Sequence, residues 1–341
     1  MSSECARSDV HNVLTSDSMK FNHCFIISII IISFFTTTKS VRVLLKQNLL
    51  PTCTRNLLFS AIINGIIHQC VTAVIRLRAF YHAIVYASDP CAILFQSSQC
   101  FFDGNLYYYT NLFSSFCCFS LFLDRLFSFK PRSSYHNHQT LASIVLILSQ
   151  IVLPIGPLYW VFYDAFYTSY VLMCTYPPPM SVMKLHEVNN IRICVLIVLL
   201  FFAIFLYIHN KIREKRMVHN VYNINSRYKS YENYLATKSV CIVIFSQILC
   251  VGPTSSITSV FIRFRDSIPL EWFHLIISYL TGLTYSNFLL PLIILYQDKQ
   301  IAKKRRIMIQ RLQNKNETSF DHFDTLKSLW GKKTGNQETL F

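Results

Sequence analysis

The sequence predicts an all-α integral membrane protein, a bundle of seven transmembrane helices, from three observations. The 341 residues are 52% hydrophobic and only 14% charged, whereas a soluble domain carries about 25% charged residues. Seven apolar runs are each long enough to cross a bilayer as a helix, which takes about 20 residues. The basic residues that give the net charge of +15 lie between these runs. This spacing argues against a nucleic-acid partner, which would need a folded, water-soluble basic surface.

Residues 21–296 contain the seven predicted spans, and the connections are too short for a second folded domain. Within the spans the sequence has no Lys, Asp or Glu, and Arg192 in the fifth is the sole strong charge. Charges are scarce in spans because each one is costly inside a bilayer. The predicted spans are residues 21–38, 57–75, 104–123, 141–163, 190–208, 239–262 and 275–296.

The distribution of Lys and Arg predicts the orientation, because these residues stay on the cytoplasmic side. Of the 32 Lys and Arg residues, 24 lie in the connections after the first, third and fifth spans and in the carboxyl-terminal segment. We therefore expect residues 1–20 to form an extracellular amino-terminal segment and residues 297–341 a cytoplasmic basic tail. A cleaved signal peptide is the alternative interpretation of the first span. Cleavage would place the most basic connection between spans outside, so the charge distribution disfavours it.

The third span ends in CFSLFLDRLFSF (118–129), which places Asp124 beside Arg125. Adjacent helical residues point about 100° apart, so a simple intrahelical pair is not expected. Side chains at the end of a span can reach water by snorkelling. The pair is therefore either an anchor at the membrane boundary or a switch. As a switch, Arg125 would be held by polar groups of neighbouring helices in one state and freed for a cytoplasmic partner in another.

Seven spans, an outside amino terminus and D-R at the foot of the third helix resemble the G-protein-coupled receptors. In that superfamily a cysteine 25 residues before the arginine forms a disulfide with a cysteine of the second outer loop. Cys100 has this spacing from Arg125, and Cys174 is the one cysteine of residues 164–189. The resemblance implies a Cys100–Cys174 disulfide and coupling to a heterotrimeric G protein through Asp124 and Arg125.

Two prolines are expected to kink helices, because proline removes a backbone hydrogen bond. Pro253 ends CVGP (250–253), where the superfamily has C-W-x-P, so the tryptophan is missing. Pro291 lies in LPLIILY (290–296), where the superfamily has N-P-x-x-Y, so the asparagine is missing and the tyrosine is displaced. These departures indicate a divergent branch of receptors.

Three segments are similar to the nematode chemosensory serpentine receptors of class alpha, and the resemblance covers nearly the whole chain. The segments are LHEVNN (185–190), RYKSYENYLATKSVCIVIFSQ (227–247) and LLPLIILYQDKQIAKKRR (289–306). The resemblance implies an olfactory or gustatory receptor in the plasma membrane of sensory neurons, in their cilia.

A small-molecule ligand is expected in the outer halves of the helices, since cavities of helical bundles bind small molecules. The alternative is helix packing, because Ser and Thr bond across membrane helices and aromatic rings fill space. Amine receptors of the superfamily carry an aspartate 18 residues before the arginine, where this sequence has a tyrosine. A neutral or weakly polar ligand, such as an odorant, is therefore expected. The candidate ligand-binding residues are Tyr107, Tyr108, Asn111, Thr254, Ser255, Thr258 and Thr284.

The segment after the last span predicts contact with an anionic inner leaflet of the lipid bilayer. In QDKQIAKKRRIMIQRLQ (297–313), Ile301, Met308 and Leu312 fall on one helical face and basic residues lie elsewhere. This pattern is typical of a basic amphipathic helix on a membrane surface. A disordered basic tail is the alternative interpretation.

Enzymatic activity, a cofactor and a metal ion are not expected. The spans hold neither paired aspartates nor H-E-x-x-H, and no cysteine pair has zinc spacing. A multi-pass transporter or a ligand-gated channel is the alternative function. Such proteins place ionisable groups inside their spans along the transport route, and these spans have almost none.

Overall fold

The computed structural model describes residues 5–46, 50–128, 138–220, 224–264 and 268–314. The chain divides into two compact units, Met1–Leu295 and Tyr296–Phe341. The predictions for the end of the basic tail, residues 315–341, fall outside the part that the structure describes.

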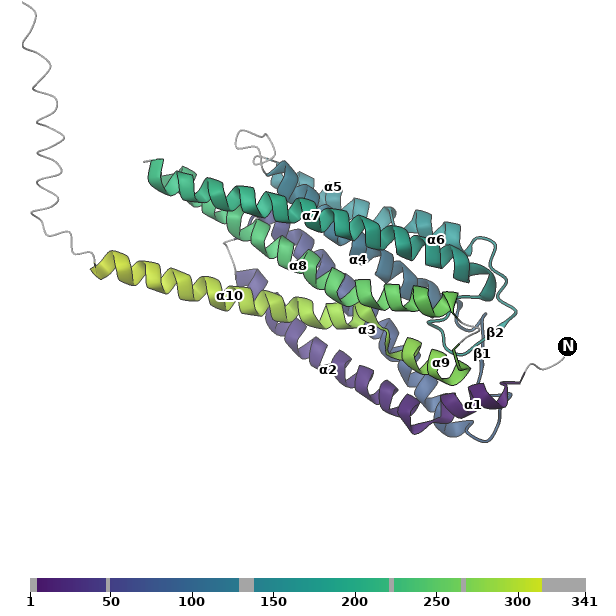
Figure 1. Ribbon diagram of the computed structural model, residues 1–341. Helices are drawn as coiled ribbons and strands as arrows, with labels where there is room; N and C mark the ends of the chain where they lie inside the picture. Colours follow the sequence, from purple (N-terminus) through teal and green to yellow (C-terminus); the bar gives the residue numbers. More distant parts are fainter. Residues whose placement is uncertain (1–4, 47–49, 129–137, 221–223, 265–267, 315–341) are drawn as a thin grey trace, which may run out of the picture. The chain divides into compact units, whose positions relative to one another are not determined.

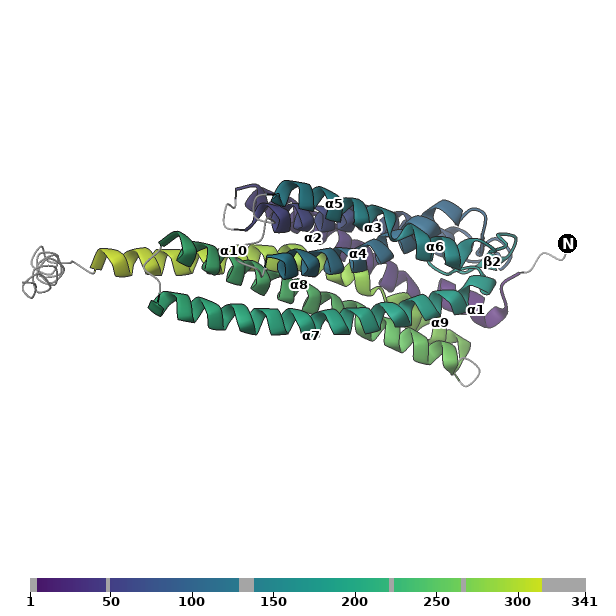
Figure 2. The same cartoon turned by 90° about the horizontal axis from the view of Figure 1, so that it is seen from above.

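The predicted all-α architecture is confirmed, since helices form the spans of the first unit (Figures 1 and 2). Six spans are long and apolar enough to cross a membrane within the described residues. The seventh, α4, is less apolar, but its 27 residues extend about 40 Å. The spans are α2 (Asp17–Lys46), α3 (Thr52–Val85), α4 (Phe101–Phe127), α5 (Gln139–Val152) with α6 (Ile155–Phe162), α7 (Val182–Asn220), α8 (Ile224–Arg263), and α9 (Leu270–Tyr279) with α10 (Gly282–Asn314).

The helices extend beyond the apolar runs that predict them. Hydropathy marks only the part of a helix that faces lipid, whereas the backbone satisfies its own hydrogen bonds wherever the helix continues. The predicted connection after residues 57–75 begins later than expected, because α3 runs on to Val85 and carries Arg76 into the bundle. Likewise α10 includes residues 297–314, where an amphipathic helix is expected. The side chains of Ile301, Met308 and Leu312 lie outside the described residues.

Two of the predicted runs each consist of two helices. The fourth run breaks between α5 and α6, where Pro154 lacks the N–H that would continue the helix. The last run breaks between α9 and α10, just before Gly282. A Cβ on Gly282 would collide with the carbonyl oxygen of Cys250 and the hydroxyl of Thr254 on α8, so only glycine allows this approach. The prolines expected to kink helices, Pro253 and Pro291, lie inside α8 and α10.

The largest apolar core lies among α3, α4, α7, α8 and α10 of the first unit. Leu57, Leu121 and Ile244 are completely buried in it. Many large apolar side chains on the spans are exposed, among them Phe35 on α2 and Phe201 and Phe205 on α7. Such an exposed apolar exterior is the expected partner of lipid tails.

One end of the first unit carries two disulfides, and we call it the disulfide-bearing end. There the short helix α1 (Ser8–Thr15) lies near the strands β1 (Phe95–Gln96) and β2 (Tyr170–Val171), as Figure 1 shows. The two strands pair antiparallel and join the connection before α4 to the connection before α7. The disulfides are Cys5–Cys91 and Cys100–Cys174.

Candidate ligand-binding site

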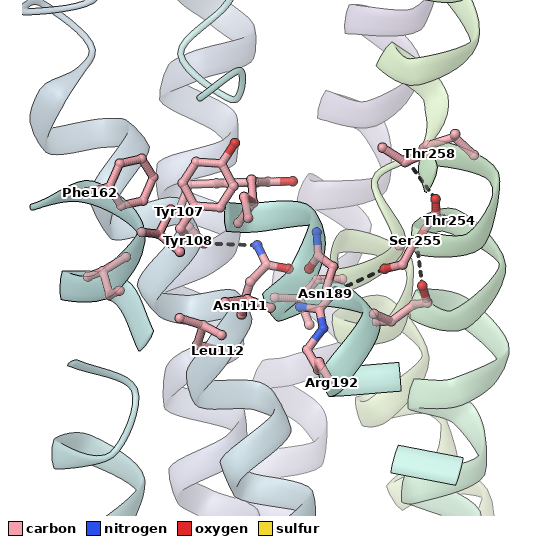
Figure 3. A pocket seen from close by; sticks show the side chains of 18 residues that line it. Tyr107, Tyr108, Asn111, Leu112, Phe162, Asn189, Arg192, Thr254, Ser255 and Thr258 are labelled. Atoms are coloured by element: carbon pink, nitrogen blue, oxygen red, sulfur yellow. Dashed lines mark hydrogen bonds between the residues drawn. The ribbon is translucent and has the colours of Figure 1, made fainter. Parts of the chain in front are cut away.

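A cavity with two adjoining chambers lies near the disulfide-bearing end. The small chamber, of about 110 Å³, is lined by α4, α6, α7, α8 and the start of α10 (Figure 3). The large chamber, of about 370 Å³, is lined by α3, α4, α7, α8, α9 and the segment that follows β2. The chambers form one site because they share the lining residues Tyr107, Tyr108, Leu185, Asn189, Ser255, Thr258 and Leu280.

The structure brings six of the seven candidate ligand-binding residues together around the small chamber. Thr284 is the exception, because it is completely buried on α10 and its backbone carbonyl accepts a hydrogen bond from Gln69 Nε2 at 3.1 Å. It lines neither chamber. The six that line the small chamber are Tyr107, Tyr108, Asn111, Thr254, Ser255 and Thr258.

Hydrogen bonds fix several of these side chains at the wall of the small chamber (Figure 3). Arg192 Nη2 on α7 donates to Ser255 Oγ on α8 at 3.1 Å, and Asn111 Nδ2 donates to the carbonyl oxygen of Tyr107 at 2.9 Å. The hydroxyl of Thr254 donates to the carbonyl of Val251 in its own helix at 2.8 Å. The side chains of Asn111 and Arg192 both line the chamber, where amide and guanidinium groups can form hydrogen bonds with a bound molecule.

The segment after β2 covers the large chamber and is tied to α4. The Cys100–Cys174 disulfide joins it to the residue before the first turn of α4. Tyr108 Oη on α4 donates to the carbonyl of Thr175 at 2.6 Å. Gly104 allows close contact, since a Cβ there would lie 3.1 Å from the carbonyl oxygen of Cys174. This lid places Tyr176 against the chamber, where burial raises the pKa of its phenol.

Two charged residues in the last turn of α4, Asp124 and Arg125, form a buried triad with Thr54 of α3. Arg125 Nη2 and Nε donate to Asp124 Oδ2 at 2.7 and 3.1 Å. Thr54 Oγ1, on the first turn of α3, donates to Asp124 Oδ2 and accepts from Arg125 Nη2, both at 2.6 Å. Helix dipoles favour this placement, because an anion faces the amino end of α3 and a cation lies at the carboxyl end of α4.

The expectation that Asp124 and Arg125 do not pair was therefore wrong. The 100° rule describes side chains that extend from the helix surface, whereas the long guanidinium of Arg125 folds back onto its neighbour. Nor do the two side chains reach water, since their exposed fractions are 0% and 2%. Arg125 is thus held by a polar group of a neighbouring helix, as the switch hypothesis requires of one state.

Comparison of the sequence with known proteins identifies the family of this chain. The model of the family "Serpentine type 7TM GPCR chemoreceptor Sra" matches residues 1–330. Serpentine receptor class alpha-29 of Caenorhabditis elegans is 53% identical over 98% of this chain and 97% of its own length. The chain belongs to the Sra family of serpentine chemoreceptors. Serpentine receptor class alpha-31 and class alpha-18 of the same nematode are 48% and 34% identical, each over 96% of this chain and over 96% and 97% of their own lengths. The relatives of this Sra receptor are thus named as receptors rather than as enzymes.

Sequence reasoning missed one candidate site residue of the Sra receptor, Arg76, because the predicted span 57–75 ends just before it. It lies in α3 and lines the large chamber with an exposed fraction of 1%. A signal was present, because polar residues recur every fourth position in Asn64, His68, Thr72 and Arg76. All four are buried, so the stripe marks one face of α3 that continues past the apolar run.

A metal site is not formed by the residues that the structure describes in this Sra receptor. No group of three His, Cys, Asp or Glu side chains converges within them. The polar side chains that line the cavity carry hydroxyl, amide, imidazole and guanidinium groups, which bind organic molecules by hydrogen bonds.

Proposed function

We propose that this Sra receptor is a chemosensory G-protein-coupled receptor of the plasma membrane, which binds a small organic ligand in the two-chamber cavity. The observation that carries the proposal is that α4 contributes residues both to the cavity and to the buried triad. Tyr107 lines the cavity and Arg125 lies 18 residues further along the same helix, about 27 Å away. Ligand binding can therefore act on the triad through one rigid element, and Asp124 and Arg125 couple the receptor to a heterotrimeric G protein.

The proposed orientation places the disulfide-bearing end outside the cell. Four cysteines are paired at this end, and disulfides persist in the oxidising extracellular space. Cys117 and Cys118, in the second half of α4, form no disulfide, as expected nearer a reducing cytosol. Residues 297–341 then lie inside, where their basic residues face an anionic leaflet.

A receptor fits the described residues better than the transporter or channel considered above. Below the cavity, the apolar core of α3, α4, α7, α8 and α10 fills the bundle. Two further cavities near Asn287 have volumes of only about 10 Å³ each, too small to conduct a solute. The Sra family itself is described as chemoreceptors, and the position of Tyr107 in place of an aspartate argues against an amine ligand.

The experiment expresses the full chain with an extracellular epitope at its amino terminus, together with a panel of G-protein α-subunits. Antibody should label the epitope on intact cells, and a ligand from a chemical panel should raise calcium or change cyclic nucleotides. Arg125→Ala should abolish the response at equal surface labelling, whereas the control Lys20→Ala, at the disulfide-bearing end, should not. An epitope that is labelled only after permeabilisation would refute the orientation, and a full response from Arg125→Ala would refute the coupling role. Immunostaining of sensory cilia tests the location.

A further inference from the structure

The ligand cavity is positively charged and contains no counter-charge of its own. Arg76 lines the large chamber and Arg192 lines the small one, and Tyr107 borders both. None of the residues that line either chamber is Asp or Glu. Arginine stays protonated in proteins, so both groups remain cations.

Within the described part of the chain, the hydrogen bonds of the Arg76 guanidinium go only to neutral acceptors. Nη1 donates to the amide oxygen of Asn22 on α2 at 3.0 Å, and Nη2 donates to the carbonyl of Ser278 on α9 at 2.6 Å. Nε has no hydrogen-bond partner there. A cation 99% removed from solvent costs several kcal/mol unless an anion compensates it. The guanidinium is thus positioned by two helices while its charge is left for another group.

Arg192 on α7 is only partly buried, but its hydrogen bonding in the small chamber is similar. Its Nη2 donates to the neutral hydroxyl of Ser255, and its Nε has no hydrogen-bond partner among the described residues. Both guanidinium groups border the volume that a ligand would occupy, and each has a donor to spare.

The acidic residues around the cavity end of the spans are engaged or exposed elsewhere. Asp103 accepts from Arg78 Nη1 at 2.6 Å. Asp164 accepts from Lys184 Nζ at 2.7 Å, and this ammonium group lowers the pKa of the carboxyl. Glu187 and Glu271 are exposed. The positive charge of the cavity is therefore not compensated by these carboxylates.

We propose that the ligand of this cavity is a small organic acid whose carboxylate pairs with Arg76. Arg192 supplies a second donor at the small chamber, and the apolar body of the ligand lies against Leu185, Phe273 and Ile277. The proposal rests on the proposed ligand-binding function of the cavity. It replaces the neutral or weakly polar ligand expected from the sequence. That expectation rested on Tyr107 in place of an aspartate, and the predicted span 57–75 ended before Arg76.

The test measures binding to the purified full-length receptor without a G protein. Thermal unfolding is followed with a thiol-reactive dye that reports the buried free thiols of Cys117 and Cys118. The probes are hexanoate and benzoate, their methyl esters, and sodium chloride. Each acid should stabilise the receptor at a concentration about tenfold below that of its ester, as expected for a charge-assisted pair. Arg76→Gln should abolish this preference, and Arg76→Lys should retain part of it.

Arg78→Gln is the matched control, because Arg78 lies two residues further on α3 but is paired with Asp103 and lines neither chamber. This variant should keep the preference for acids even if its unfolding midpoint falls. The proposal is overturned if esters match acids on the wild type, if no acid stabilises it, if Arg76→Gln keeps the preference, or if chloride acts as well as hexanoate. The wild-type comparison decides the matter even where Arg76→Gln does not fold.

Failure of the acid ligand and failure of the receptor function give different results. Stabilisation by acids without any G-protein response in cells would refute the coupling and leave the ligand assignment intact. Cellular responses to neutral compounds alone, equal in wild type and Arg76→Gln, would refute the ligand assignment and leave the receptor function intact.

Discussion

Replacing Thr54 by valine tests whether the buried triad holds the receptor in the state described here. Valine has nearly the same shape as threonine, so Thr54→Val removes one hydroxyl and creates no cavity. That hydroxyl makes two buried hydrogen bonds at 2.6 Å, one to the carboxylate of Asp124 and one from the guanidinium of Arg125. Hydrogen bonds to charged groups contribute about 1.5–3 kcal/mol each. The direct Arg125–Asp124 pair survives the change, so we expect a net loss of roughly 2–4 kcal/mol.

Two measurements follow from that magnitude. A loss of about 3 kcal/mol should lower the midpoint of thermal unfolding by roughly 4 °C, because the unfolding entropy of a chain of 341 residues is about 0.7 kcal/mol/K. The same loss raises, by about a hundredfold, the equilibrium population of any state in which Arg125 no longer contacts Asp124. Ligand-independent activation of a G protein in transfected cells should therefore rise well above that of the wild type at equal surface expression.

The matched control is Thr38→Val, an exposed threonine of α2 whose hydroxyl bonds only to a carbonyl of its own helix. It makes the same chemical change far from any charge and should leave both measurements within error of the wild type. The reasoning is refuted if Thr54→Val unfolds at the temperature of Thr38→Val and shows the same basal signalling. In that case the triad would be neither a stability element nor a lock.

Three further changes test the site. Cys100→Ser opens a disulfide loop of 74 residues and should cost about 4 kcal/mol, seen as lost surface labelling; normal labelling and response would show that the lid needs no disulfide. Gly282→Ala should destabilise by roughly 1–3 kcal/mol through overpacking, whereas Gly156→Ala, with open space around it, should leave the unfolding midpoint unchanged; equal midpoints would contradict the predicted clash. Ser255→Ala should shift ligand potency and Thr284→Ser should not, in dose–response curves; the reverse order would place the ligand elsewhere.

The spans could be predicted from the sequence because the bilayer imposes a length and a composition on them. Lipid-facing side chains must be apolar, and the helices show this directly in exposed residues such as Phe35 and Phe201. The breaks before α6 and α10 were not predicted. A break inside an apolar run leaves hydropathy unchanged, and the second one depends on how closely Gly282 approaches α8.

Sequence reasoning found the uncharged polar residues of the candidate site but missed its charged residue Arg76. Tyr107, Asn111 and Ser255 were found because polar groups inside a predicted span must face the bundle or a cavity. Arg76 was missed because the hydropathy window ends where a charge begins, although the helix does not end there. Side chains buried between helices escape hydropathy, and only the polar stripe along α3 indicates them.

Hydrogen bonds join two pairs of helices that line the cavity, α3 with α4 and α7 with α8. Between α3 and α4, Asn64 Nδ2 donates to the carbonyl of Thr110 at 3.0 Å, in addition to the triad at the far end. Between α7 and α8, Asn210 Nδ2 donates to Thr237 Oγ1 at 2.9 Å. Each pair is therefore tied together at several levels.

A ligand in the cavity touches both pairs at once, since the lining includes α3 and α4 on one side and α7 and α8 on the other. It can favour one relative position of the pairs only by the difference between its affinities for the two positions. An anion provides such a difference, because its attraction to Arg76 on α3 and to Arg192 on α7 depends strongly on the separation of the two cations. An organic acid would draw the pairs together, because its attraction to both cations opposes the repulsion between them. The charge of the ligand, rather than its bulk, is thus the property by which this cavity can change the end of α4 that holds Arg125.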